Sequence, residues 1–116
     1  MCGKIKSSEF VKFDFLTSTN APVSLNCSYS FKAQLPVDTE DKILAILVIF
    51  QADSPKDTVH FHAQCRVVFD FTGVDKLPNE DDLIAENYMT AYQEFCKKAN
   101  EALIVLGQNC FDFQEI

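Results

Sequence analysis

The sequence predicts an α+β fold in which a four-stranded antiparallel sheet is followed by one long helix packed on one face of the sheet. Apolar residues occupy every second position of Val59–Phe71 and of Val23–Leu35, a pattern typical of long strands that bury one face. In Ile84–Leu106 apolar residues recur at three- and four-residue steps, which indicates an amphipathic helix. Two more strand-like segments, Ile5–Leu16 and Ile43–Phe50, bring the number of expected strands to four. The simplest arrangement is a meander of four strands that ends in the helix.

The composition is that of a single folded domain spanning residues 1–116. Hydrophobic residues make up 47% and charged residues 23% of the chain, which excludes a disordered protein. The net charge of −7 argues against nucleic acids and anionic membranes, because both would repel the protein. The longest apolar run, Ile43–Phe50, is well short of the roughly 20 residues that a membrane helix needs. With no signal-like sequence at the N-terminus, we expect a cytoplasmic protein.

The first strand is expected at Ile5–Leu16, and the turn-forming cluster Thr17–Pro22 separates it from the second strand. The second strand, Val23–Leu35, ends at Pro36, and its polar face is rich in serine. On the first strand we expect Val11, Phe13 and Phe15 to share one face and Lys12 and Asp14 the other.

The third strand, Ile43–Phe50, is apolar on both faces, and its β-branched residues and polar flanks favour a strand over a buried helix. Such a strand needs cover on both sides, so one face should meet the helix and the other a second layer or another chain. We assume that the odd-numbered residues face the helix. The expected surface for polypeptide binding or self-association is then Leu44, Ile46, Val48 and Phe50.

The helix follows a polar, acidic segment in which Asn79 or Asp81 is the candidate N-cap. Gly107 is expected to end it. The last residues, Cys110–Ile116, alternate briefly and are expected to pack as an extended tail.

The two histidines, His60 and His62, project from one face of the fourth strand and could offer two ligands to zinc. A third ligand is not evident nearby, because Cys65 has the opposite parity and Asp70 is distant along the strand. We therefore interpret this pair as part of a polar sheet surface and predict no metal site.

No catalytic pattern is visible in the sequence. There is no G-x-S-x-G motif, and the three glycines are too scattered for a phosphate-binding loop. The carboxylates of Glu80, Asp81 and Asp82 are typical of a solvated helix start. The five cysteines lack C-x-x-C spacing and are expected to be reduced thiols. We predict a binding protein without a cofactor rather than an enzyme.

The most informative feature is a surplus of apolar surface, because the chain has 11 phenylalanines, more than one helix can cover. Such a surface suits either self-association or a groove for extended, nonpolar polypeptide. The alternative is a carrier or enzyme for a small lipid-like molecule, with an apolar pocket between sheet and helix.

The order of these elements resembles the SecB family of export chaperones and its shorter SecB-like relatives. The similarity covers Phe10 to Phe113: an edge strand, a long alternating strand, an apolar strand, a strand ending in Val67–Gly73, a long helix and a short apolar close, Phe111–Phe113.

The resemblance implies a sheet with the helix on one face, a dimer or tetramer, and capture of unfolded or nonpolar polypeptide for protein export or for stabilisation of a partner. It implies neither a cofactor nor catalysis. Docking to a translocase motor is not expected, because SecB presents an acidic sheet surface to that partner. The polar faces here instead carry residues such as Ser28, Lys32, His60 and Arg66.

Overall fold

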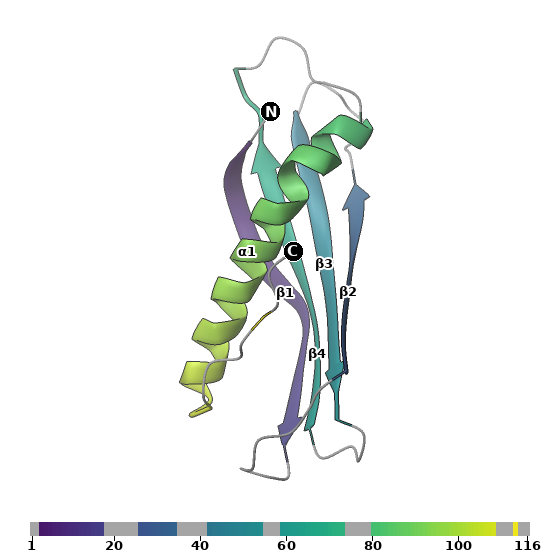
Figure 1. Cartoon of the computed structure of the whole chain (residues 1–116). Helices are drawn as coiled ribbons and strands as arrows, with labels where there is room; N and C mark the ends of the chain where they lie inside the picture. Colours follow the sequence, from purple (N-terminus) through teal and green to yellow (C-terminus); the bar gives the residue numbers. More distant parts are fainter. Residues whose placement is uncertain are drawn as a thin grey trace.

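The computed structural model describes residues 3–17, 26–34, 42–54, 59–73, 80–108 and 113. Its elements are a four-stranded antiparallel sheet and one helix that lies across one face of the sheet (Figure 1). The predicted fold class is therefore confirmed. The molecule is elongated, with extents of 52 × 25 × 22 Å. In chain order the elements are β1 (Lys4–Thr17), β2 (Asn26–Gln34), β3 (Ile43–Asp53), β4 (Val59–Asp70) and α1 (Glu80–Val105).

The strand order, β1-β4-β3-β2, corrects the predicted meander. Strands β2, β3 and β4 are consecutive neighbours, as expected, but β1 pairs with β4 instead of β2. Strands adjacent in sequence usually pair, which is why the sequence favoured a meander. The phenylalanines of β1 instead find their aromatic partners on β4 and α1, where Phe13 contacts Phe61 and Phe10 contacts Phe95.

Strand β1 contains two irregularities in its pairing with β4, one between Ile5 and Ser7 and one between Phe10 and Lys12. The extra residue at the second one shifts the alternation of side chains. Val11 is consequently 62% exposed and does not share a face with Phe13 and Phe15, which corrects the sequence-based assignment. Phe10 takes its place against the helix.

The face of β3 that meets the helix is also opposite to the one assumed. Leu44, Ile46 and Val48 are fully buried, and Phe50 is 2% exposed. The reason is the register with β4, which pairs Leu44 with Phe69 and Val48 with Cys65. Because β4 has only one apolar face, the residues opposite that face are the ones buried under α1. The odd residues Leu47 and Ile49 are half-buried on the other face.

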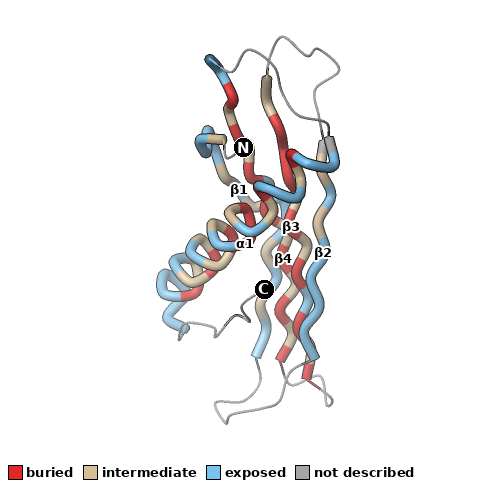
Figure 2. The backbone as a smooth tube through the Cα atoms, turned by 45° about the horizontal axis from the view of Figure 1, so that its top comes forward, coloured by how far each residue is buried: buried red, intermediate tan, exposed pale blue. Residues whose placement is uncertain are grey.

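The core lies between β3, β4 and the sheet-facing side of α1, whereas β2 is exposed along most of its described length (Figure 2). Helix residues in this core include Leu83, Phe95 and Leu103. Phe113, the one described residue of the C-terminal segment, packs on Phe50 and Phe95, while the rest of the predicted tail lies outside the described residues.

The helix ends at the predicted glycine. Gly107 has a positive φ of 78°, and the amide of Gln108 donates to the carbonyl of Leu103 at 2.8 Å, as in a glycine-capped helix end. At the other end, Asp81 lies inside the helix and Asn79 lies outside the described residues. No helix in the described part of the chain is long and apolar enough to cross a bilayer.

Candidate functional site

The helix covers only part of the sheet face on which it packs. Figure 1 shows α1 crossing the strands obliquely, and the ends of the strands extend beyond it. Aromatic side chains gather at both edge strands of the sheet, β1 and β2. We call Phe10, Phe13 and Phe15 the β1 aromatic cluster, and Tyr29, Phe31, Tyr88 and Tyr92 the β2 aromatic cluster.

The β1 aromatic cluster is half-buried and rests on a buried ring beneath it. The centroids of Phe10 and Phe13 are 5.0 Å apart, and Phe13 and Phe15 each lie 5.4 Å from Phe61, all in edge-to-face arrangements. Phe61 is fully buried and so holds the outer rings in place. Edge-to-face pairs of this kind contribute about 0.5–1.5 kcal/mol beyond their buried area. The cluster is therefore a preformed, half-buried apolar surface.

The β2 aromatic cluster lies at the opposite edge of the sheet, where two residues of β2 meet two tyrosines of α1, and it combines rings with hydroxyl groups. Tyr29 is 38% exposed and its ring centroid lies 5.3 Å from that of Tyr92, while Phe31 lies 5.5 Å from Tyr88. The Tyr92 hydroxyl is buried and makes no hydrogen bond among the described residues. Burial, together with the neighbouring Cys96 thiol, raises the pKa of Tyr92 far above its usual range, so this hydroxyl stays protonated.

The four residues predicted to form the contact surface do not lie on the surface of the described structure. Leu44, Ile46, Val48 and Phe50 form the floor of the core under α1. Only Phe50 joins the aromatic network, through contacts with Phe61 and Phe95. The apolar surplus was visible in the sequence as the number of phenylalanines. Its location at β1 and β2 was missed, because the face of each strand depends on the bulge and on the register.

The sheet face away from the helix has a different character. A hollow of about 420 Å³ is lined by residues of all four strands, among them the cations Lys32 and Arg66 and the apolar Val11 and Leu47. No described element covers this face of β3. The hollow is therefore a mixed surface, in which apolar side chains lie next to the basic side chains of Lys32 and Arg66.

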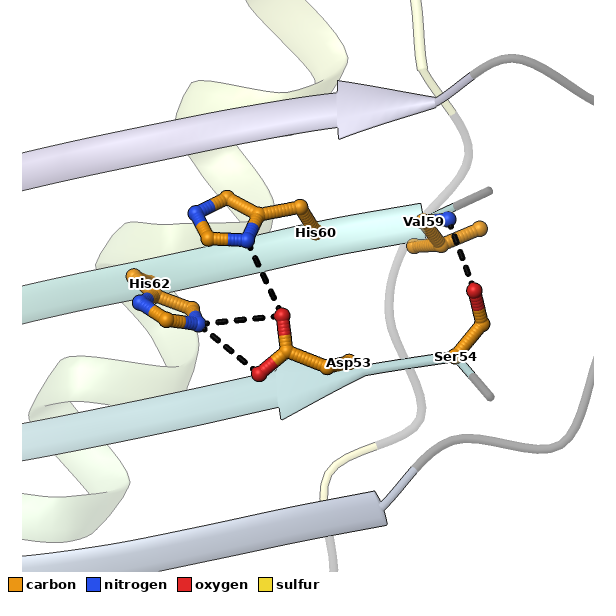
Figure 3. A network of polar contacts seen from close by, with 5 residues as sticks. All are labelled: Asp53, Ser54, Val59, His60 and His62. Carbon is orange, nitrogen blue, oxygen red and sulfur yellow. Dashed lines mark hydrogen bonds and ion pairs between the residues drawn. The ribbon is translucent and has the colours of Figure 1, made fainter. Parts of the chain in front are cut away.

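The two histidines lie on the same helix-free face, near the end of the β3–β4 hairpin (Figure 3). Their partner is Asp53, which the sequence reasoning missed because it lies across the hairpin, directly opposite His60. The Asp53 carboxylate accepts from His60 Nδ1 at 2.9 Å and from His62 Nε2 at 2.9 Å. These contacts, the His62 hydrogen bond above all, hold the pKa of Asp53 below its usual range.

Comparison with known proteins shows that this chain has a fold similar to that of a solved structure. No protein-family model matches the sequence, and no curated protein matches it. Among solved structures, the chain is similar to the SecB-like chaperone Rv1957 of Mycobacterium tuberculosis, in complex with a ChAD peptide from the HigA1 antitoxin. The TM-score is 0.66 at 11% identity, and the match covers 98% of this chain and 89% of the other.

A protein of unknown function from Streptococcus agalactiae matches less well, with a TM-score of 0.44, 13% identity, and coverage of 95% of this chain and 94% of the other. At 11% identity the first match establishes the arrangement of the elements but not the role of any residue. The resemblance predicted from the order of elements is thereby confirmed, and the chain has the fold of a SecB-like chaperone.

Proposed function

We propose that the protein binds extended, nonpolar segments of unfolded polypeptide, as a chaperone and not as an enzyme. The observation that carries this proposal is the pair of aromatic clusters at the two sheet edges, each of which is partly exposed beside α1. The fold supports it, because a solved SecB-like chaperone with this fold holds a peptide from a partner protein.

The β1 aromatic cluster is suited to this role by its position at a sheet edge. Strand β1 pairs only with β4 among the described strands, so its outer main chain is available to a peptide. A peptide that pairs with such an edge presents every second side chain to the same face, about 7 Å apart. Those side chains would lie beside the rings of Phe10, Phe13 and Phe15. Main-chain pairing would supply affinity without demanding one sequence, which suits a chaperone.

The β2 aromatic cluster offers a second contact for the same polypeptide. Strand β2 is the other edge of the sheet, and its residues Asn26–Ser30 are exposed. Aromatic rings next to a free edge provide the same combination of main-chain pairing and apolar contact as on the β1 side. A long client could therefore occupy both edges in turn.

We also propose that the protein self-associates, as a dimer or tetramer, through the C-terminal end of α1. Ile104, Val105 and Leu106 are 59%, 86% and 59% exposed, an apolar run at the end of the helix that projects past β1 (Figure 1). Such runs mark interaction surfaces more often than solvated ones.

The cysteines bear on the cellular compartment of the protein. Cys27, Cys65 and Cys96 are free thiols, which supports the cytoplasm as the compartment.

The biological role that follows is binding of a client for protein export or stabilisation of a specific partner. The peptide complex of the mycobacterial protein, which contains a segment of an antitoxin, favours the partner role. The mixed surface around Lys32 and Arg66 differs from an acidic docking face, so we do not extend the proposal to a translocase motor.

The test uses fluorescence anisotropy to measure how tightly the protein binds a reduced, unfolded polypeptide that carries a fluorescent label. Phe13→Ser should weaken binding by about tenfold, because a half-buried ring contributes more than 1 kcal/mol of apolar contact. Val11→Ser is the matched control, since Val11 lies on the same strand but on the opposite face. Equal binding by both variants, or no binding by the unaltered protein, would contradict the proposal. Circular dichroism checks that both variants are folded.

The described part of the chain offers no support for the alternative of a small-molecule pocket between sheet and helix. The rings of Phe50, Phe61 and Phe95 are buried there, and Phe50 lies 5.4 Å from Phe61 and 5.6 Å from Phe95. Side chains therefore fill this part of the interface. Native mass spectrometry that retains a lipid-like ligand would reverse this conclusion.

A further inference from the structure

We propose that Asp53, His60 and His62 form a binding site for a divalent transition-metal ion, with Zn²⁺ as the preferred candidate. The site lies on the sheet face away from α1, and the proposal does not depend on polypeptide binding. Two imidazoles and a carboxylate are the ligand types that zinc selects when three protein ligands leave a fourth position open.

The three side chains already converge on one point. One ligand atom from each of them lies within 4.8 Å of the other two. His60 Nδ1 is 2.9 Å from one carboxylate oxygen of Asp53, and His62 Nε2 is 2.9 Å from the other. Figure 3 shows both rings and the carboxylate projecting from the same side of β3 and β4. No other set of three such side chains comes this close in the described part of the chain.

The change needed to admit an ion is small. Ligand atoms about 2.1 Å from a tetrahedral zinc ion are about 3.4 Å from one another. Each hydrogen-bonded nitrogen and oxygen therefore has to separate by about half an ångström, and the two histidine nitrogens, which lie within 4.8 Å of each other, have to settle at about the same 3.4 Å. Rotation about the side-chain torsions can supply both changes. The ion would replace the hydrogen bonds to Asp53 with three coordinate bonds, and solvent would supply the fourth ligand.

The backbone holds the three residues in this arrangement. Asp53 and His60 are direct partners in the β3–β4 ladder, and His62 is two residues further on the same face. The imidazole rings are stacked with centroids 3.8 Å apart and planes at 28°. Just beyond them, Ser54 and Val59 close the hairpin: the Ser54 amide donates to the Val59 carbonyl, and the Val59 amide donates to Ser54 Oγ. Binding therefore requires little ordering of the chain.

Access and charge also favour a cation. The side chains of His60 and Asp53 are 36% and 41% exposed, and that of His62 is 21% exposed, so an ion can reach all three. On the neighbouring strand, Asp14 is directly opposite His62 and exposed, which adds a second negative charge beside the site. The net charge of −7 attracts cations to the molecule as a whole.

The decisive measurement is calorimetric titration of the reduced, full-length protein with ZnCl₂. We expect one ion per chain with micromolar affinity. His62→Gln and Asp53→Asn should each weaken zinc binding by at least about tenfold. Loss of a residue that only hydrogen-bonds to a metal ligand already lowers the affinity by about tenfold or more, and loss of a ligand lowers it further. Glu9→Gln is the matched control for charge, since Glu9 is an exposed carboxylate of β1 paired with Arg66, away from the cluster. It should change the affinity less than twofold.

A second measurement uses the unaltered protein and does not depend on variants. The chain has 2 histidines, and both belong to the proposed site. Imidazole NMR signals should therefore shift together and saturate at one equivalent of Zn²⁺. Cobalt substitution separates this site from zinc bound to cysteine, because thiolate ligands produce a charge-transfer band in the near ultraviolet.

Three outcomes would each overturn the proposal. The first is the absence of saturable binding at micromolar zinc, and the second is equal weakening by Glu9→Gln and Asp53→Asn. The third is a thiolate band in the cobalt spectrum with unshifted histidine signals.

Discussion

Asn87 shows at the scale of a single residue how the helix is attached to the start of β1. Its side chain is fully buried, and its amide nitrogen donates to the Leu83 carbonyl at 2.8 Å while its oxygen accepts from the amide of Gly3 at 3.1 Å. Gly3 itself is closely packed, because a Cβ there would lie 2.8 Å from the ring of Phe71. A polar side chain in an otherwise apolar interface is tolerated because both ends of its amide are satisfied.

We predict that Asn87→Leu lowers the free energy of unfolding by about 1–3 kcal/mol, because the Gly3 amide would lose its acceptor. Urea denaturation measures the change. Met89→Ala is the control, since Met89 lies on the same helix but is 43% exposed, and its effect should stay within about 0.5 kcal/mol. Equal losses in the two variants would mean that the hydrogen bonds of Asn87 do not stabilise the fold.

Strand β3 shows at the scale of an element that two apolar faces do not have the same role. Its even-numbered residues are core, whereas Leu47 and Ile49 are half-buried on the helix-free face. An apolar residue on the first face contributes to folding, and one on the second is available for contacts with other molecules. Substitutions at neighbouring positions of this strand should therefore separate stability from binding.

We predict that Val48→Asp lowers the free energy of unfolding by at least about 3 kcal/mol, because it places an unpaired carboxylate in the core. Leu47→Asp introduces the same charge one residue away on the opposite face and should cause a clearly smaller loss. Thermal and urea unfolding of both variants measure the difference. If the two variants were equally destabilised, the assignment of the faces of β3 would be incorrect.

The molecule as a whole has surfaces of two kinds. The helix side carries the aromatic clusters and the exposed end of α1, while the helix-free side carries the histidine cluster and the hollow around Lys32 and Arg66. These features lie on opposite faces of an elongated sheet, so the proposed polypeptide binding and the proposed metal binding would involve different residues. Self-association through the helix end would leave the strand edges free.

We predict that Val105→Asp shifts the protein toward the monomer, because it places a charge in the apolar run at the end of α1. Light scattering of the solution mass measures the shift. Gln108→Asp adds the same charge at a neighbouring exposed position without removing an apolar side chain, and it should leave the mass unchanged. If the unaltered protein were already a monomer, that result would contradict the proposed self-association. It would not contradict the proposed polypeptide binding, which anisotropy tests separately.

Local sequence patterns were sufficient to predict the number, type and order of the described elements. The alternation in β2 and β4, the apolar run of β3 and the helical spacing of α1 are local patterns, and each corresponds to an element at nearly the predicted residues. Gly107 at the helix end was predictable for the same reason, since a positive φ is a local requirement. The surplus of phenylalanine likewise predicted that some aromatic side chains would remain partly exposed.

The way in which these elements meet could not be predicted from local patterns and became visible in the folded chain. In the folded chain β1 lies beside β4, and a bulge turns Val11 toward solvent. The even-numbered residues of β3 are buried, and Asp53 lies next to the two histidines. Each of these depends on which strands are neighbours and in what register, and a shift of one residue moves a side chain to the other face. Register is a relation between segments distant in sequence, so the pattern within any one strand does not contain it.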